Sequence, residues 1–181
     1  MPNYQAVGLG VQIISRDPQD VLVAYWLGSC LGIGMYDPST HIGGLLHAVL
    51  PEHPGSDGVT PQKFVDSGVV SLIDGMVKAG ADRRKLIIWM AGGANMILAL
   101  GSAKAFDIGS RNIQAAFKVF DSLRLRISGQ EVGGNAGRTV RVYVGEGRMT
   151  VRKIGEEEHN ITISHYEKQV SQGENALCTR F

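Results

Sequence analysis

A cysteine and a histidine near the start of the chain could act together as a thiol nucleophile and its base. Cys30 lies between Gly28 and Gly32, and His47 follows seventeen positions later inside an apolar segment. A thiol attacks well only as its thiolate, whose free pKa is about 8.5, and a neighbouring imidazole can lower that value. We therefore expect His47 to activate Cys30 for attack on an electrophilic carbon.

The glycines on either side of Cys30 suit a backbone that approaches a substrate closely. Glycine adopts dihedral angles that are closed to other residues. The amides around Ser29 and Leu31 could therefore face the oxyanion that forms when a carbonyl carbon is attacked. The structural alternative is a buried thiol beside a hydrogen-bonded core histidine, because free cysteine is among the most buried residue types. On this pair alone, catalysis and a structural role both stay open.

Composition and charge argue against several classes of function. The 181 residues carry 18 Lys and Arg against 17 Asp and Glu, so no basic surface predicts binding to nucleic acid or to an anionic membrane. Cys30 and Cys178 form neither a metal-ligand spacing nor a disulfide pattern, so we expect no metal, no cofactor and a reducing compartment. No apolar run is long enough to span a bilayer, and the first residues do not resemble a signal peptide. The sequence predicts a cytoplasmic protein without membrane insertion.

The hydrophobic pattern predicts a fold rich in strands. Residues 6–15 alternate apolar and polar side chains, which is the period of a half-buried strand. Further strands are expected over 21–27, 31–36, 43–50, 86–91 and 123–132, followed by a hairpin over 140–144 and 149–151. The segment after Cys30 is short and stops at Asp37-Pro38, so it favours a strand. This argues against the nucleophile elbow of α/β hydrolases, which needs a helix there.

Two amphipathic helices are expected from apolar residues at helical spacing. The first begins at Thr60-Pro61, with Thr60 as the N-cap, and ends at Gly80. Ser110 is expected to cap the second helix, whose buried stripe runs from Ile113 to Phe120. We expect both stripes to belong to the core.

The chain is long enough to bury one core without disulfides. We predict a single domain over residues 1–155, followed by an acidic and polar extension over 156–181 that is expected to be partly disordered. Cys178 lies in this extension and is expected to be an incidental thiol.

Six segments of the chain resemble, in order, a known family: the chemoreceptor glutamine deamidases, CheD. They are Leu-Gly-Ser-Cys (27–30), His-Ala-Val-Leu-Pro (47–51), Lys-Phe-Val-Asp (63–66), Gly-Gly-Ala-Asn-Met (92–96), Ile-Gly-Ser-Arg-Asn (108–112) and Gly-Gly-Asn-Ala-Gly-Arg (133–138). The resemblance implies an α+β fold, a three-layer β/β/α sandwich in which two packed sheets carry helices on one side. It also implies a relation to the deamidase domain of cytotoxic necrotizing factor toxins.

The same resemblance implies a reaction and partners. The reaction is hydrolysis of selected glutamine side chains in methyl-accepting chemotaxis receptors, which gives glutamates. In this mechanism the Cys30 thiolate attacks the carboxamide carbon, and His47 protonates the departing ammonia and then activates water against the thioester. Amides near Cys30, with Ser29 as a helper, are expected to stabilise the oxyanion. The second implied partner is CheC, a phosphatase of the response regulator CheY.

One position departs from the family pattern. Many members carry a threonine six residues before the cysteine, where it is thought to orient the histidine, and this chain has Ala24. Either another group orients His47, such as a backbone carbonyl or the hydroxyl of Tyr25 or Thr60, or the protein is a weaker enzyme. The alternative function is therefore a catalytically weak or inactive binding protein for chemoreceptors or a CheC-type phosphatase. A third reading is an amidase that acts on small molecules.

Overall fold

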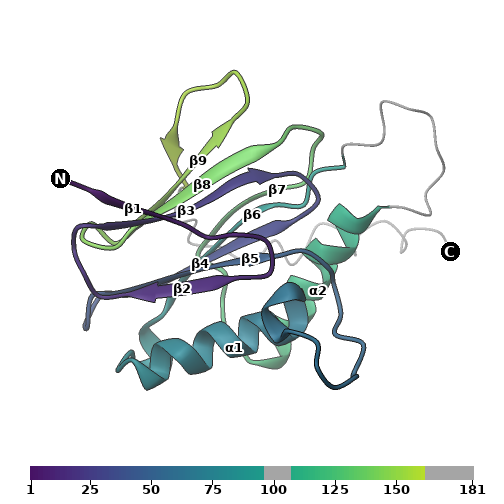
Figure 1. Ribbon diagram of the computed structural model, residues 1–181, viewed down its shortest axis with the longest axis horizontal. Coiled ribbons are helices and arrows are strands. Elements are labelled where there is room, and N and C mark those ends of the chain that lie inside the picture. Colours follow the sequence, from purple (N-terminus) through teal and green to yellow (C-terminus); the bar gives the residue numbers. More distant parts are fainter. Residues whose placement is uncertain (96–106, 162–181) are drawn as a thin grey trace, which may run out of the picture.

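Two five-stranded sheets and two α-helices form three layers in the computed structural model (Figure 1). The structure describes residues 1–95 and 107–161. The first sheet has the strand order β1-β3-β8-β9-β10, and the second has the order β2-β5-β4-β6-β7. Helices α1 and α2 pack on the second sheet. The predicted β/β/α sandwich is confirmed, and the relation to the toxin domain stays a prediction.

The chain passes between the two sheets several times, and its described part ends with three consecutive strands of the first sheet. The strands are β1 (Asn3–Ala6), β2 (Gln12–Ser15), β3 (Asp20–Leu27), β4 (Leu31–Asp37), β5 (Ile42–Ala48), β6 (Ile87–Gly92), β7 (Gly129–Val132), β8 (Arg138–Tyr143), β9 (Arg148–Lys153) and β10 (His159–Asn160). The helices are α1 (Val65–Lys78) and α2 (Ile108–Ser122). Among the described residues, no helix is long and apolar enough to cross a membrane.

Strand β4 separates two hydrophobic cores. Its side chains toward the helices are Leu31, Ile33 and Met35. Its other face has glycine where the first sheet comes closest, because a β-carbon on Gly32 would meet Leu27 Cδ1 at 2.8 Å and Val140 Cγ2 at 2.9 Å. Glycine is therefore required there by the close packing of the two sheets.

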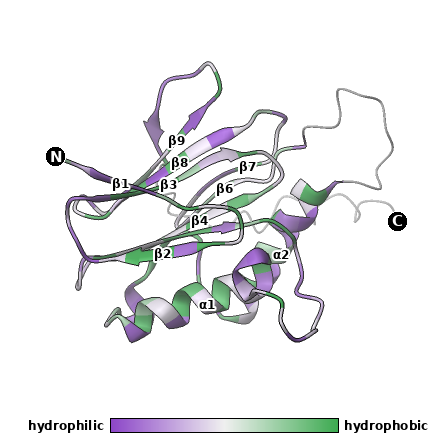
Figure 2. Cartoon of the chain, viewed as in Figure 1, coloured by the Kyte–Doolittle hydropathy of each residue, from purple (hydrophilic) through white to green (hydrophobic). Residues whose placement is uncertain are grey.

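The predicted amphipathic helix is confirmed in α1, but it starts later than expected. Its buried side chains are Val65, Val69, Leu72, Ile73 and Met76. Figure 2 shows hydrophobic and hydrophilic residues alternating along the turns of α1. Thr60 makes no side-chain cap and precedes only a 3₁₀ turn, Pro61–Lys63. The α-helix begins after Phe64, because Phe64 is extended and bridges Leu50, whose carbonyl accepts from Val65 N at 2.8 Å.

The predicted cap of the second helix is wrong. Asp107 is the N-cap of α2, and its carboxylate accepts a hydrogen bond from Ser110 N at 2.9 Å. Ser110 therefore lies inside the first turn. Aspartate is as good an N-cap as serine, so residue type alone could not decide between Asp107 and Ser110.

The single strand predicted over residues 6–15 is also wrong. Strand β1 pairs in parallel with β3 in the first sheet, whereas β2 pairs antiparallel with β5 in the second. The chain crosses between the sheets over residues 7–11, where Gly10 has a positive φ of 66°. Alternation is satisfied by each short strand separately, so it does not reveal the crossing. The strand predicted over 123–132 is likewise shorter, because pairing begins only at Gly129.

The first sheet continues beyond the predicted domain end at residue 155. Strand β10 pairs with β9, and Ile161 is buried. Glu158 accepts from Thr150 Oγ1 at 2.5 Å and pairs with Arg141 Nη1 at 2.6 Å. The domain therefore extends at least to Ile161. The rest of the predicted extension, residues 162–181 with Cys178, lies outside the described residues.

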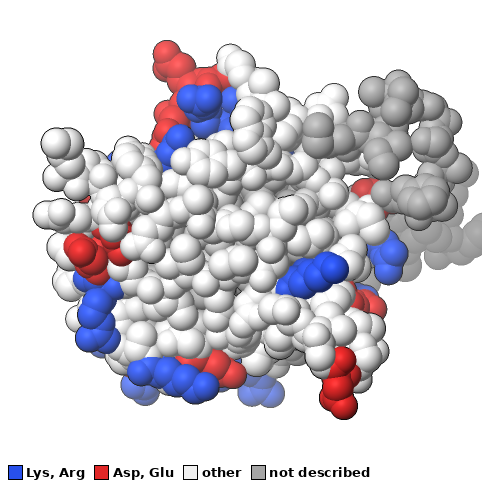
Figure 3. Space-filling view, in the orientation of Figure 1, with Lys and Arg blue, Asp and Glu red and all other residues white. Residues whose placement is uncertain are grey.

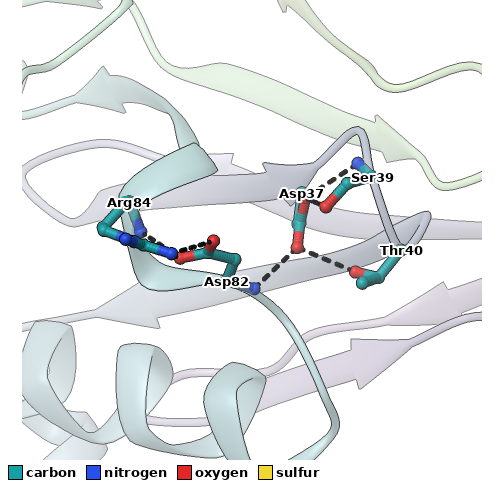
Figure 4. Close-up of polar contacts among 5 residues, drawn as sticks. All are labelled: Asp37, Ser39, Thr40, Asp82 and Arg84. Carbon is teal, nitrogen blue, oxygen red and sulfur yellow. Dashed lines mark hydrogen bonds and ion pairs between the residues drawn. The ribbon is translucent and has the colours of Figure 1, made fainter.

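A buried carboxylate fastens the β4–β5 turn to the segment after α1 (Figure 4). Asp37 is 0% exposed and accepts hydrogen bonds from Ser39 N at 2.8 Å, Thr40 Oγ1 at 2.9 Å and Asp82 N at 2.7 Å. Burial alone would raise the pKa of Asp37. These donors outweigh burial and lower that pKa to about 2.

Asp37→Asn should destabilise the fold by about 1–3 kcal/mol at pH 7, because an amide cannot accept from all of these donors. A carboxyl pKa of about 2 in the folded state lies below the unfolded value of about 3.9. The stability from Asp37 is therefore fully present above pH 4 and is lost as pH falls toward 2. Urea unfolding across this range measures the difference, with the exposed Asp74→Asn as control. An unchanged midpoint at pH 7 would contradict this assignment.

Candidate active site

Three hydrogen bonds from other parts of the chain fix the corner between β3 and β4, residues 28–30. The carbonyls of its successive residues accept as follows: Gly28 from Ala94 N at 2.7 Å, Ser29 from Asn112 Nδ2 at 2.8 Å and Cys30 from Gly93 N at 2.8 Å. In a trans peptide the N–H points opposite to the carbonyl. The amides that follow the first two carbonyls, those of Ser29 and Cys30, are therefore directed away from these donors.

The register of β4 and β5 brings Cys30 and His47 to one face of the second sheet. Gly32 pairs with His47, and Cys30 lies two residues before Gly32. Such diagonal neighbours have Cα atoms about 7–8 Å apart. Cys30 packs against the core between the two sheets, and His47 shares this face because it alternates with buried Leu45. The structure thus brings the two predicted residues together.

A backbone carbonyl orients the imidazole of His47. Nδ1 of His47 lies 3.1 Å from the carbonyl oxygen of Val7. A carbonyl can only accept, so Nδ1 carries the proton and Nε2 presents a lone pair. Nε2 is buried and has no hydrogen-bond partner among the described residues. Of the three groups considered from the sequence, the carbonyl holds the ring, and the hydroxyls of Tyr25 and Thr60 do not.

Ala24 lies beside the group that holds His47. Val7 N donates to Val23 O at 2.7 Å, which extends the β1–β3 pairing and brings Val7 next to Ala24. Ala24 is 0% exposed and packs in the core between the sheets. The position where many family members have threonine is therefore adjacent to the Val7 carbonyl, which already occupies Nδ1.

Burial sets the protonation of both groups. It raises the pKa of the Cys30 thiol, an effect that the residue's own backbone amide only partly offsets. It also lowers the pKa of the His47 imidazole, against the opposing effect of the Val7 carbonyl. At neutral pH the resting pair is a thiol and a neutral imidazole. This is opposite to the lowered thiol pKa expected from the sequence. A thiol in this state would need a base to take its proton before it could attack a carbon.

Two buried polar side chains that the sequence did not single out support the site. Asn112 is 0% exposed and donates to Ser29 O at 2.8 Å and to Val49 O at 3.0 Å. It therefore ties the corner before Cys30 to the chain just after His47. Arg138, 4% exposed, donates to Gly92 O at 3.2 Å. Both lie in segments that resemble the family, but nothing in their types indicated which carbonyls they bind.

Comparisons with known proteins identify the family of the chain. A family model described as CheD chemotactic sensory transduction matches residues 49–153. The chain belongs to the CheD family.

Among the described residues, no three His, Cys, Asp or Glu side chains gather closely enough to hold a metal ion.

Three relatives of this CheD-family chain are each named probable chemoreceptor glutamine deamidase CheD. The Symbiobacterium thermophilum protein is 39% identical over 159 residues, which is 87% of this chain and 96% of that protein. The Solibacter usitatus protein is 38% identical, covering 83% of this chain and 89% of its own. The Methanococcus vannielii protein is 42% identical, covering 75% and 86%.

The raised pKa of Cys30 predicts slow alkylation at neutral pH. In a Cys178→Ala variant, Cys30 is the sole thiol. It should react with iodoacetamide more slowly than glutathione at pH 7, because less of it is thiolate. The rate should continue to rise above the pH at which an ordinary thiol levels off. Mass spectrometry of the alkylated protein gives the rates. A plateau already reached at pH 7 would instead indicate a preformed thiolate and imidazolium.

Proposed function

We propose that this chain hydrolyses the side-chain amide of selected chemoreceptor glutamines to glutamate, with Cys30 as nucleophile and His47 as base. The observation that carries the proposal is the state of His47 Nε2, which is buried, unpartnered among the described residues and on the face that Cys30 shares. The names of the relatives, chemoreceptor glutamine deamidases, supply the substrate class. Amide hydrolysis needs both a nucleophile and a group that can protonate the leaving ammonia.

Acylation begins when Nε2 of His47 accepts the thiol proton of Cys30. The sulfur then bonds to the carboxamide carbon, and the resulting imidazolium keeps its Nδ1–H on the Val7 carbonyl. His47 donates the proton from Nε2 to the amide nitrogen, the C–N bond breaks and ammonia leaves. The glutamine side chain is now a thioester of Cys30.

Deacylation uses the same imidazole, which now acts as a base toward water. Neutral His47 takes a proton from water as the water oxygen attacks the thioester carbon. The C–S bond breaks, the sulfur of Cys30 recovers the proton, and glutamate is released. The Val7 carbonyl holds the ring in one tautomer throughout, so Nε2 serves both steps.

The amides of Ser29 and Cys30 are the donors that we propose for the oxyanion. The carbonyls before them are occupied by Ala94 N and Asn112 Nδ2, which directs these two N–H groups away from the interior. Leu31, also considered from the sequence, already pairs with Ala48 in the β4–β5 ladder. Donors fixed before the substrate binds cost no reorganisation in the transition state.

The same proposal places the chain in the cytoplasm, since the mechanism needs a reduced thiol and reducing compartments maintain one. Its partner there is the receptor that carries the glutamines. A CheC-type phosphatase remains a predicted second partner.

Cys30→Ala should abolish deamidation of receptor fragments, with at least about a thousandfold loss, because the covalent path is removed. The fold should persist, since only one sulfur atom is lost from a half-buried site. Peptide mass spectrometry detects the conversion of glutamine to glutamate. Cys178→Ala is the matched control and should keep wild-type turnover. Wild-type turnover by Cys30→Ala would refute the thiol mechanism.

Ala24→Thr should not increase turnover, because the Val7 carbonyl already occupies Nδ1 of His47. It should lower stability by about 1–3 kcal/mol, since a larger side chain enters a core position that is 0% exposed. Steady-state deamidation and thermal unfolding test both expectations. A clear gain in turnover would mean that the carbonyl orients the ring poorly. If neither protein deamidates any receptor while both bind it, the alternative of a binding protein without turnover is correct.

A further inference from the structure

Strand β3 ends in a bulge beside the corner that carries Cys30. Ala24 and Leu27 are three residues apart, yet they pair with β8 residues that are two apart. The extra residue lets both side chains face the core, where each is 0% exposed. Tyr25 and Trp26 are consequently turned outward, and they are 43% and 75% exposed. Bulges of this kind commonly redirect side chains next to active sites.

Trp26 is held in a conformation that favours glycine. Its φ is 59°, which is rare for a bulky side chain. Such backbone strain raises the free energy of the folded chain and persists only where the surrounding structure imposes it. Burial of the indole does not offset this cost, because Trp26 is largely exposed. The chain therefore keeps a strained aromatic residue in solvent four residues before Cys30.

A second segment with exposed apolar side chains lies against the base. Val7 and Val11 each bind His47 through a carbonyl, to Nδ1 at 3.1 Å and to the backbone N at 3.0 Å. Between them lies Leu9, which is 68% exposed. Trp26 lies four residues before Cys30, so their Cα atoms are at most about 14 Å apart. Exposed apolar groups thus stand on both of the segments that adjoin the catalytic pair.

The face over the β1–β2 connection is poor in charge. This connection crosses the middle of the view in Figure 1, and the same region of Figure 3 is largely white. Lys63 packs against Gly10 at the bend of the connection, and most other coloured side chains lie toward the margins. Depletion of charge is typical of the centre of a protein interface. The surface therefore suits a macromolecular substrate better than a free small amide.

We propose that Trp26, together with Leu9, binds apolar side chains next to the target glutamine and so helps to select which receptor glutamine is modified. This inference rests on the proposed function. A glutamine side chain is identical at every position of a receptor, so discrimination must come from its neighbours. A tryptophan offers a large rigid apolar area, and it is enriched among the residues that dominate binding energy. Because Trp26 takes no part in the proton transfers of the proposed mechanism, we assign it to specificity, and its loss should affect binding more than chemistry.

Trp26→Gly separates contact from strain, because glycine adopts a positive φ without steric cost. The variant should be as stable as wild type or more stable. Its KM for a receptor fragment should rise about tenfold or more, with kcat and the alkylation rate of Cys30 unchanged. Tyr4→Ala is the matched control: Tyr4 is 56% exposed and pairs with Val21, five residues before Trp26 on β3. This change should leave every parameter unchanged.

Binding can be measured without turnover in the Cys30→Ala background. The chain has two tryptophans, and Trp89 is 1% exposed. A receptor fragment that lacks tryptophan should therefore shift the emission of Trp26 to shorter wavelength. The Trp26→Gly protein should show no shift and about tenfold weaker binding by calorimetry.

The outcomes separate the two proposals. Deamidation by wild type with an unchanged KM for Trp26→Gly and no emission shift overturns the role of Trp26 and leaves the deamidase function intact. A wild-type protein that binds receptor through Trp26 without deamidating it overturns the enzyme and retains this surface. If no receptor fragment binds, the proposed surface is wrong.

Discussion

The hydrogen bond from His47 Nδ1 to the Val7 carbonyl is the contact on which the candidate site depends. It joins residues that are 40 positions apart and makes Nε2 the unprotonated nitrogen of the neutral ring. The contact exists because the chain leaves β1 in the first sheet, crosses over residues 7–11 and enters β2 in the second. The crossing brings a backbone acceptor next to Ala24, the position at which the sequence departs from the expected family pattern. A carbonyl cannot rotate or donate, so it fixes the tautomer more strictly than a hydroxyl would.

The location of Cys30 and His47 between the two sheets determines their protonation states. The same burial that raises the pKa of Cys30 lowers the pKa of His47, so both groups rest in their neutral forms. A buried ion pair would have to overcome the desolvation of two charges. A neutral pair avoids that cost at rest, and in the proposed mechanism charge is created only as the proton moves during attack. A thiol that is not ionised is also less susceptible to oxidation.

Support for the site comes from backbone carbonyls that are fixed from the interior. Asn112 reaches from α2 through the helix-side layer to Ser29 and Val49, and the loop after β6 supplies Gly93 N and Ala94 N. The amides of Ser29 and Cys30 are therefore directed away from these interior donors. The strained Trp26 lies in the bulge at the end of β3, just before this corner. The fixed carbonyls of the corner and the exposed aromatic residue that precedes it therefore have separate physical causes.

Much of the fold follows from local patterns in the sequence. The apolar runs that became β3, β4, β5 and β6 were predictable, as were the β8–β9 hairpin and the stripe of α1, because side-chain period is a property of neighbouring residues. Residue types and spacing suggested the pairing of Cys30 with His47, and the resemblance to the family added the β/β/α layers. Residue type and spacing were sufficient for these conclusions.

Other features were decided only by tertiary structure. Residues 6–15 alternate as one strand would, but the partners that divide them between two sheets lie elsewhere in the chain. Asp107 replaced Ser110 as the cap of α2 because both types cap equally well and the packing of the helix chooses between them. The group that orients His47 is a carbonyl, which every residue possesses, so no side-chain pattern could identify Val7. The direction of the Cys30 pKa depends on how deeply the sheets enclose the thiol, and burial is set by the whole fold.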